Sequence, residues 1–283
     1  MKEALPSYKS HLFSVAYNIL GQIQDAEDVV QDCFEDILST PDREVQNEKA
    51  YLTRVVANKS IDRLKKLQKE REQYPGTWLP EPYLQPETPA VDEEKIDILS
   101  YGLMSLIEQL NPVERAVFVL REAFDYSYAS LSEILQTSET NCRKILSRAR
   151  GKLRSEPLRQ TDAKSYRELL DAFLRAHQHG DIKSLASLLK EDIIVYSDGG
   201  GKASAALKPI TGSDNVMQLL EAISRMEAVQ AQTVQIVRIN GHHGLVFISN
   251  QKPETIFYFD ADEMCFSKMY IIRNPDKIKM GSI

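Results

Sequence analysis

The chain has little of what an extracellular or membrane protein relies on. It contains three cysteines in 283 residues, Cys33, Cys142 and Cys265. Their odd number and wide spacing argue against a disulfide framework and against a zinc site. No apolar run approaches the roughly 20 residues of a membrane-spanning helix. The N-terminal sequence MKEALPSYKS lacks the basic and then apolar layout of a signal peptide. We therefore expect a cytoplasmic protein, and we expect no metal or other cofactor.

Positive charge is also scarce in total, because the net charge is −6. The charges are nevertheless segregated along the chain. Residues 49–72 hold 8 basic and 3 acidic side chains, and residues 138–160 hold 7 basic and 2 acidic side chains. Residues 1–48, in contrast, hold 3 basic and 10 acidic side chains. Since salt screens charges beyond roughly 8–10 Å, local patches decide what a surface binds. Two basic patches are therefore compatible with nucleic acid despite the acidic total.

The region from Asn111 onward carries the pattern of a helix-turn-helix. Asn111, followed by Pro and then by Glu114, has the residues of a capped helix start. Residues 128–135 and 139–153 follow as helical segments around a short turn, and Ser138 can cap the second of them. A recognition helix presents its N-terminal side chains to base edges in the major groove. The pattern predicts DNA binding, whereas the alternative is a helical hairpin with a solvated basic tail. The candidate contacts are Glu139, Thr140, Asn141, Arg143 and Lys144 at the N-terminal end of the second segment, and Arg148 further along, which suits a phosphate contact.

The upstream basic segment, residues 49–71, mixes cations with amide and aromatic side chains. Cations follow a phosphate backbone, while amides and aromatic rings contact exposed bases, which is how proteins hold single strands. The segment is therefore a candidate for binding a melted strand, and an ordinary amphipathic surface helix is the alternative. The candidate residues are Tyr51, Arg54, Asn58, Lys59, Asp62, Arg63, Lys65 and Lys66.

The linker at residues 73–92 separates the two basic regions. It contains five prolines and Trp78, the only tryptophan of the chain, which is typical of a semi-rigid connection. Because an exposed indole is costly, we expect Trp78 to dock on a neighbouring domain. Helices are expected before the linker at residues 8–20 and 25–38, and after it at residues 93–110.

The C-terminal part changes character. Helices are expected at residues 163–179, 182–189 and 212–226, and strands at 193–196, 233–239, 245–249, 255–259 and 264–272. The dipeptide Asn240-Gly241 predicts a hairpin turn. Helices followed by a meander of strands indicate an α+β domain with a curved sheet wrapped on helices.

Catalysis by this C-terminal part would need an acid or histidine in an apolar pocket. The candidates are Asp198, His177, His179, His242 and His243. The DGGGK sequence is not a phosphate-binding loop, since it lacks the first glycine and the final Ser or Thr of that motif. Three successive glycines instead suit a close approach of backbone at a docking surface. We expect no enzymatic activity, and a ligand-sensing pocket stays open as an alternative.

Three segments together resemble the extracytoplasmic-function sigma factors of bacterial RNA polymerase. DAEDVVQDCFEDI resembles the helix that binds core polymerase, which implies contacts from Asp25, Asp28, Asp32 and Phe34. AYLTRVVANKSIDRLKK resembles the helix that binds and melts the −10 element. LNPVERAVFVLRE, YASLSEIL and SETNCRKILSRARGKL resemble the domain that reads the −35 element. The resemblance implies promoter DNA and the β and β′ subunits of core polymerase as partners. It also implies initiation of transcription at specific promoters.

Three further motifs resemble a subgroup with a fused C-terminal SnoaL-like, NTF2-fold domain, which implies a built-in regulator. They are WLPEP (Trp78, Leu79, Pro80, Glu81, Pro82), DGGGK (Asp198, Gly199, Gly200, Gly201, Lys202) and NPDK (Asn274, Pro275, Asp276, Lys277). The implied architecture is two all-α sigma domains, the second with the helix-turn-helix, followed by an α+β NTF2/SnoaL-like cone with a curved antiparallel sheet. The domains span residues 1–72, 98–157 and 162–283, with the linker at 73–97.

A different class of protein shares the helix-turn-helix. A ligand-responsive regulator would bind duplex DNA without core polymerase, and an enzyme with a DNA-binding anchor is a third option. The options differ over residues 25–38, which only a sigma factor needs as a polymerase-facing surface. One departure from the family concerns YASLSEIL, where an acidic and a small residue are usual, so the packing of that helix is expected to differ slightly.

Overall fold

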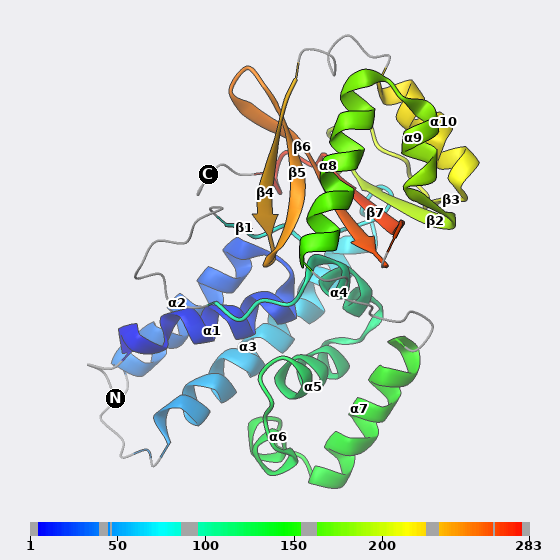
Figure 1. Cartoon of the computed structure of the whole chain (residues 1–283). Coiled ribbons are helices and arrows are strands. Elements are labelled where there is room, and N and C mark those ends of the chain that lie inside the picture. Colours follow the sequence, from blue (N-terminus) through cyan, green and yellow to red (C-terminus); the bar gives the residue numbers. More distant parts are fainter. Residues whose placement is uncertain are drawn as a thin grey trace. The chain divides into compact units, whose positions relative to one another are not determined.

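The computed structural model describes residues 5–39, 45, 47–85, 96–153, 163–224, 232–262 and 264–278. The chain divides into two compact units (Figure 1). The helical unit comprises residues 1–72, 90–99 and 103–157, and the sheet unit comprises residues 73–89, 100–102 and 158–283. Within the described ranges, no helix has both the length and the apolar content needed to cross a membrane.

The helical unit contains the helices predicted around both basic patches. They are α1 (Leu5–Leu20), α2 (Ile23–Ser39), α3 (Glu48–Arg71), α4 (Tyr101–Leu106, whose first two residues belong to the sheet unit), the short 3-10 helix η2 (Ile107–Gln109), α5 (Pro112–Glu122), α6 (Tyr128–Ile134) and α7 (Glu139–Leu153). The predicted start of α5 is confirmed: Asn111 accepts hydrogen bonds from the first turn, and Glu114 closes the capping box. Local capping chemistry therefore sets this helix boundary.

The helix predicted at residues 93–110 is wrong in its first part. Its first three residues lie outside the described part of the chain, and the helix begins only at Tyr101. The Asn18 side chain of α1 explains the non-helical segment. Its amide donates to the Asp97 carbonyl at 2.9 Å, and its carbonyl oxygen accepts from the Leu99 backbone N–H at 3.0 Å. These tertiary bonds satisfy backbone groups that a helix would have paired internally.

The sheet unit contains the curved sheet that the resemblance implies. Its elements are β1 (Leu84–Gln85), α8 (Ala163–His179), α9 (Ile182–Ser187), β2 (Leu189–Asp198), β3 (Ile210–Thr211), α10 (Ser213–Ser224), β4 (Thr233–Ile239), β5 (His242–Ser249), β6 (Lys252–Ala261) and β7 (Phe266–Ile272). The strand order is β1-β4-β5-β6-β7-β2-β3. All neighbours are antiparallel except β2 and β7. The Asn240-Gly241 turn is confirmed, with both residues at positive φ.

Strand β2 is longer than its prediction at residues 193–196. It begins at Leu189, so the helix predicted to reach that residue ends earlier, at Ser187. The Phe266 N–H donates to the Leu188 carbonyl at 2.8 Å and begins the parallel pairing with β7. This pairing joins residues far apart in sequence, and it overrides the local helical preference.

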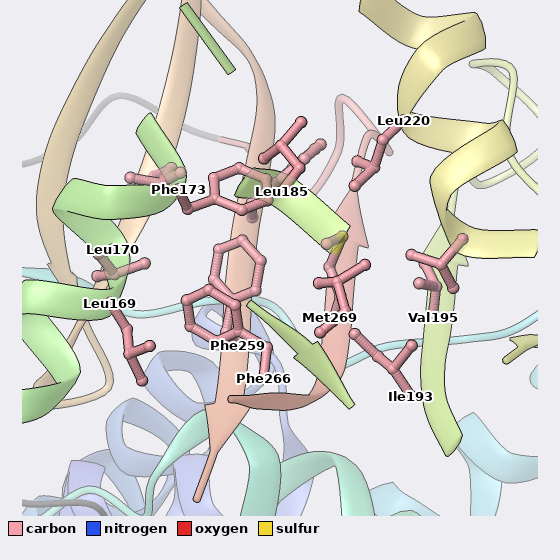
Figure 2. Close-up of a cluster of buried hydrophobic side chains, with 14 of the residues drawn as sticks. Leu169, Leu170, Phe173, Leu185, Ile193, Val195, Leu220, Phe259, Phe266 and Met269 are labelled. Atoms are coloured by element: carbon pink, nitrogen blue, oxygen red, sulfur yellow. The ribbon is translucent and has the colours of Figure 1, made fainter. Parts of the chain in front are cut away.

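The inner face of the sheet packs against the helices through a large apolar core (Figure 2). Phe173 of α8 contributes a ring whose centroid lies 5.1 Å from that of Phe259 and 6.0 Å from that of Phe266. The Phe259 and Phe266 rings are 4.4 Å apart. Aromatic pairs at such distances add to the apolar burial. Side chains of α8, β6 and β7 therefore pack tightly together on the inner face.

The outer face of the sheet carries a second apolar cluster, to which the linker contributes Leu79. Tyr101, the first residue of α4, inserts its ring at 5.2 Å from Tyr258 and 5.6 Å from Tyr270. Beside these rings lies the half-buried Asp260, which accepts a hydrogen bond from the Tyr270 hydroxyl at 2.8 Å. Burial raises the pKa of Asp260 to about 6. A carboxyl group in the outer cluster therefore titrates within the range of ordinary buffers.

We expect the Asp260→Asn variant to remove a pH dependence of stability. The folded pKa lies above the ordinary value of 3.8, so the folded unit binds this proton more tightly than the unfolded chain does. The resulting stabilisation is complete below about pH 4 and is lost as pH rises through about 6; it amounts to at most about 3 kcal/mol. Thermal unfolding of both proteins from pH 4 to pH 7 measures it. A difference between them that stays constant over this range would contradict the prediction.

Candidate nucleic-acid interface and docked linker

Helices α6 and α7 form the predicted helix-turn-helix, and serine caps start both of them. The Ser127 hydroxyl accepts from the Ser130 N–H at 3.1 Å, and the Ser138 hydroxyl accepts from the Asn141 N–H at 3.2 Å. Between the helices, Gln136 adopts a positive φ of 51°. The cap predicted at Ser138 is confirmed. The turn chemistry therefore sets the direction in which α7 leaves α6.

Helix α7 separates an apolar face from a basic one. Its buried residues are Cys142, Leu146, Ala149 and Leu153, at helical spacing. The predicted contacts Thr140, Arg143, Lys144 and Arg148 are exposed. Two other candidates already have partners within the helix-turn-helix. The Asn141 amide donates to the Thr137 hydroxyl at 2.9 Å, and Glu139 pairs with Arg143 at 2.7 Å. The structure thus places most of the predicted −35 residues on one accessible surface.

Helix α3 packs against the helix-turn-helix inside the helical unit, and this contact occupies Asn58. The side-chain amide of Asn58 donates to the Arg54 carbonyl at 2.9 Å and to the Ile134 carbonyl of α6 at 3.0 Å. A side-chain amide has two N–H donors, so both are used. Sequence patterns within α3 did not indicate this tertiary bond. In this arrangement Asn58 has no donor left for a base.

A groove of about 620 Å³ runs between α2 and α3. It is lined by Asp25, Asp28, Val29, Gln31, Asp32, Lys59, Asp62, Arg63 and Lys66. The structure separates the predicted polymerase contacts: Asp28 and Asp32 are exposed, Phe34 is half-buried, and Asp25 is buried. The Asp25 carboxylate accepts from Arg63 Nε at 2.5 Å. Asp25 therefore holds a basic side chain of α3 in place instead of facing solvent.

The remaining cations of α3 differ in their pairing. Lys59 pairs with Asp36 of α2 at 2.8 Å, and this hydrogen bond raises the pKa of Lys59. Lys65 pairs with Asp62 of its own helix at 2.8 Å. Lys66 is exposed at the groove, while Tyr51 and Arg54 are half-buried. Exposed ion pairs of this kind are weak, and a phosphate can compete for their cations.

A buried charge cluster, which sequence reasoning missed, joins segments of the helical unit. Glu108 of η2 accepts from Arg71 Nη1 at 2.9 Å and from Arg115 Nη1 at 2.6 Å. Arg115 is fully buried and also donates to the Ile19 carbonyl of α1 at 3.2 Å. Burial lowers the pKa of Arg71 to about 10. No local pattern indicates this cluster, because Arg71 and Ile19 come from helices distant in sequence from Glu108 and Arg115.

Three predicted motifs of the sheet unit meet at the carboxylate of Asp198. It pairs with Lys277 Nζ at 2.6 Å and accepts from the Leu79 N–H at 2.9 Å. It also accepts from the Tyr74 hydroxyl at 2.5 Å. The Lys277 ammonium lies 4.0 Å from the centre of the Trp78 ring. WLPEP, DGGGK and NPDK thus form one contact set, called here the linker clamp.

Glycine is required at the clamp because the backbone approaches other groups closely. A Cβ atom at Gly200 would lie 2.4 Å from the Asn274 side chain, and one at Gly199 would lie 2.1 Å from the Ala203 carbonyl oxygen. Gly200 also has a positive φ of 60°. The close approach expected for the three glycines is confirmed. At the rim of the clamp, Lys202 pairs with Asp276 at 2.5 Å.

The linker continues along the edge of the sheet. Strand β1 pairs antiparallel with β4, and Leu84 lies opposite Ile239. The Tyr83 N–H donates to the Asn240 side-chain carbonyl at 2.9 Å. Within WLPEP, residues 79–82 are buried, and the Pro80 carbonyl accepts from the Tyr101 hydroxyl at 2.8 Å. Residues 73–85 are therefore folded as part of the sheet unit, and Trp78 docks there as expected.

The candidates for a general base do not gather at one place. Asp198 is engaged in the linker clamp, while the His177 ring stacks on Phe173 with centroids 6.2 Å apart. His242 and His243 lie on β5. Burial lowers the pKa of both His177 and His242. Among the residues that the structure describes, no group of three His, Cys, Asp or Glu side chains has the arrangement of a metal site.

Comparison with known proteins agrees with the two basic helical regions described above. Residues 6–70 match Sigma-70 region 2, and residues 102–153 match Sigma-70 region 4. The chain is 32% identical over 242 residues to the ECF RNA polymerase sigma factor SigJ of Mycobacterium tuberculosis, covering 83% of this chain and 77% of SigJ. It is 27% identical over 187 residues to the probable ECF sigma factor SigI of the same species, covering 65% and 64%.

The fold comparison extends over nearly the whole chain. The crystal structure of Mycobacterium tuberculosis SigJ superposes with a TM-score of 0.77 at 27% identity, covering 98% of both chains. Helical sigma domains and a following α+β domain with a curved, open sheet are thus common to both proteins. Two sigma regions in the expected order, together with this long relative, lead to one conclusion: the chain belongs to the extracytoplasmic-function RNA polymerase sigma factors.

Proposed function

We propose how the parts of this sigma factor divide the work of initiation. Residues 1–72 bind core polymerase, through its β and β′ subunits, and the −10 element. Residues 98–157 read the −35 element. Residues 162–283, with the docked linker, regulate these activities in cis. Sigma factors as a family bind core polymerase and promoter DNA, and the proposal assigns those contacts to surfaces of this chain.

The groove between α2 and α3 is the observation that carries the proposal. It places the exposed carboxylates Asp28 and Asp32 beside the basic side chains of α3. Opposite charges on adjoining surfaces suit a protein that binds a basic protein surface and a phosphate backbone side by side. Asp25 takes a supporting part, because it is buried and bonded to Arg63.

Charge reversal at Asp28 and Asp32 tests the polymerase-binding surface. We expect the D28K/D32K variant to bind core polymerase about 10- to 30-fold more weakly, because two attractive contacts become repulsive. Fluorescence anisotropy with labelled full-length protein measures this affinity. The control is E27K/E35K, which makes the same charge change on exposed residues of α2 that do not line the groove. Equal affinities of the two variants would refute the assignment.

Base contact through the N–H groups of Asn58 requires the helical unit to open. Both N–H groups of its amide are used in the packing of α3 against α6. We propose that this packing belongs to the DNA-free form and that α3 leaves α6 when the −10 strand is bound. Partner binding can drive such a change only by favouring the open arrangement over the closed one.

Regulation in cis is proposed to act through the linker clamp, since the linker joins the two promoter-binding segments. Deleting residues 162–283 would remove the proposed regulatory domain and also the partners that bury Leu79 and Trp78. A deletion therefore cannot separate loss of regulation from loss of the folded linker. A point variant within the clamp tests regulation more cleanly.

The C-terminal domain is proposed to be a regulator without catalytic activity, and the protein to act in the cytoplasm with the polymerase. The dispersed general-base candidates and the aromatic packing on the inner face support this assignment. A small-molecule ligand is not part of the proposal. A regulator that works without core polymerase is not favoured, because Sigma-70 region 2 covers residues 6–70.

A further inference from the structure

The side chain of Tyr128 occupies the point where α5, α6 and α7 come together. It is the first residue of α6, directly after the Ser127 cap. The guanidinium carbon of Arg143, on α7, lies 4.5 Å from the centre of the Tyr128 ring. That of Arg121, on α5, lies 5.2 Å from it. One aromatic ring therefore contacts two cations from two other helices.

The position of the Tyr128 ring is itself fixed. The Ser127 hydroxyl accepts from the Ser130 N–H at 3.1 Å, which anchors the first turn of α6. Arg121 Nη1 donates to the Tyr126 carbonyl at 2.8 Å and ties the preceding loop to α5. Since these bonds hold the backbone on both sides of Tyr128, the ring presents a steady surface to Arg143.

Arg143 is held but remains accessible. Its Nη2 donates to Glu139 at 2.7 Å, and its side chain is 51% exposed. That bond uses one of five N–H donors of the guanidinium. A guanidinium next to an aromatic face keeps its charge and its forked donors, which match O6 and N7 of guanine. A long side chain ordered before binding loses less conformational freedom when it meets a base.

We propose that Tyr128 is a positioning residue for promoter recognition, in that it orients Arg143 for base readout in the −35 element. The proposal rests on the proposed function of residues 98–157. Tyr128 touches no base in this scheme and acts through Arg143. The ligand of the site is the edge of a base pair in duplex DNA, with guanine as the expected base.

The test measures sequence preference, which a merely structural role would not shift at one position. Holoenzyme is reconstituted from the full chain and core polymerase, and it selects from promoter duplexes randomised in the −35 element. Arg143→Ala is expected to flatten the preference at one or two positions. Tyr128→Leu is expected to flatten the same positions, with about 2- to 5-fold weaker binding of the preferred duplex.

Three further variants make the comparison sharp. Tyr128→Phe retains the ring and is expected to keep the wild-type preference. The Y128L/R143A double variant is expected to match R143A alone, because the ring has nothing left to orient. Arg148→Ala, the matched control, is expected to weaken binding of all sequences without changing their order.

Three outcomes would overturn the inference while leaving the proposed function intact. In the first, Y128L keeps the full preference that R143A loses. In the second, Y128L and Y128F alter the preference equally, which would assign the effect to the hydroxyl group or to the fold. In the third, R143A itself leaves the preference unchanged, so that Arg143 does not read bases. A wild-type holoenzyme that selects no −35 sequence would contradict the proposed function as well.

Discussion

The Asp198→Asn variant is expected to release the linker and to shift the fluorescence of Trp78 to longer wavelengths. Asparagine keeps the size of the side chain but removes the charge that balances Lys277, whose side chain is 7% exposed. Removing one partner of a buried ion pair costs about 3–5 kcal/mol, since the other charge stays buried without compensation. One carboxylate oxygen accepts from Leu79 N–H and Lys277 and the other from Gly200 N–H, so the asparagine NH2 group would face an N–H donor in either orientation.

Trp78 makes this release directly measurable, because it is the only tryptophan of the chain. Emission spectra report the surroundings of its ring, and thermal unfolding reports stability. The matched control is Asp276→Asn, which breaks the exposed pair with Lys202, whose side chains are 56% and 61% exposed. Exposed pairs contribute about 0–1 kcal/mol, so this control should keep the wild-type spectrum. Wild-type emission from Asp198→Asn would contradict the prediction.

A second arm of the same experiment isolates the ion pair from the rest of the clamp. Lys277→Met removes the cation but leaves Asp198 its bonds from Tyr74 and Leu79. The D198N/K277M double variant is expected to be more stable than the sum of the single effects predicts, because neither charge is then left alone. In transcription with core polymerase, D198N should differ from wild type and D276N should not. Equal output from all three proteins would reject regulation through the clamp.

The Glu108→Gln variant is expected to destabilise the helical unit by about 3 kcal/mol or more. Glu108 is the shared carboxylate of Arg71 and Arg115, and the Arg115 side chain is 0% exposed. Its neutralisation leaves the fully buried Arg115 and the 11% exposed Arg71 without the carboxylate that balances their charge. Within the described residues, Arg115 Nε and Nη2 already lack a hydrogen-bond partner. The thermal midpoint should fall by roughly 10 °C.

Two variants show whether burial causes this effect. Glu122→Gln, the control, affects an ion pair with Arg150 whose side chains are 32% and 52% exposed, and it should change the midpoint little. Arg115→Met is expected to cost less than Glu108→Gln, because it removes the unsatisfied donors together with the charge and leaves Arg71 its carboxylate. Calorimetry of the three full-length variants measures their thermal midpoints and so ranks their stabilities. A Glu108→Gln protein as stable as the control would show that the cluster carries no net energy.

Local chemistry explains which elements the sequence alone predicted. The capping residues Asn111 and Ser138 are adjacent to the backbone groups they satisfy, so their effect is visible in a short window of residues. The Asn240-Gly241 turn was predictable for the same reason, since both residues tolerate positive φ. Helical spacing of apolar residues and clustered basic charge likewise indicated α3 and α7 before any contact was known.

Contacts between distant segments were not predictable in this way. The extension of β2 depends on pairing with β7, and the late start of α4 depends on Asn18 of α1. The acidic candidates of α2 also look alike in sequence, but Asp25 is buried in the folded protein whereas Asp28 is exposed. Such outcomes depend on which surfaces meet after collapse, and a local pattern carries no information about them.

The amino-acid order alone determined the family, the order of the sigma regions, the helix-turn-helix and the presence of a fused α+β domain, because these depend on periodicity, capping and short motifs. Tertiary structure alone decided that Asp198 and Lys277 enclose the linker, that Glu108 serves two arginines, and that Tyr128 faces Arg143. Each of these contacts joins residues from different elements. Their energy comes from burial and from complementary charge, which exist only after the chain has folded.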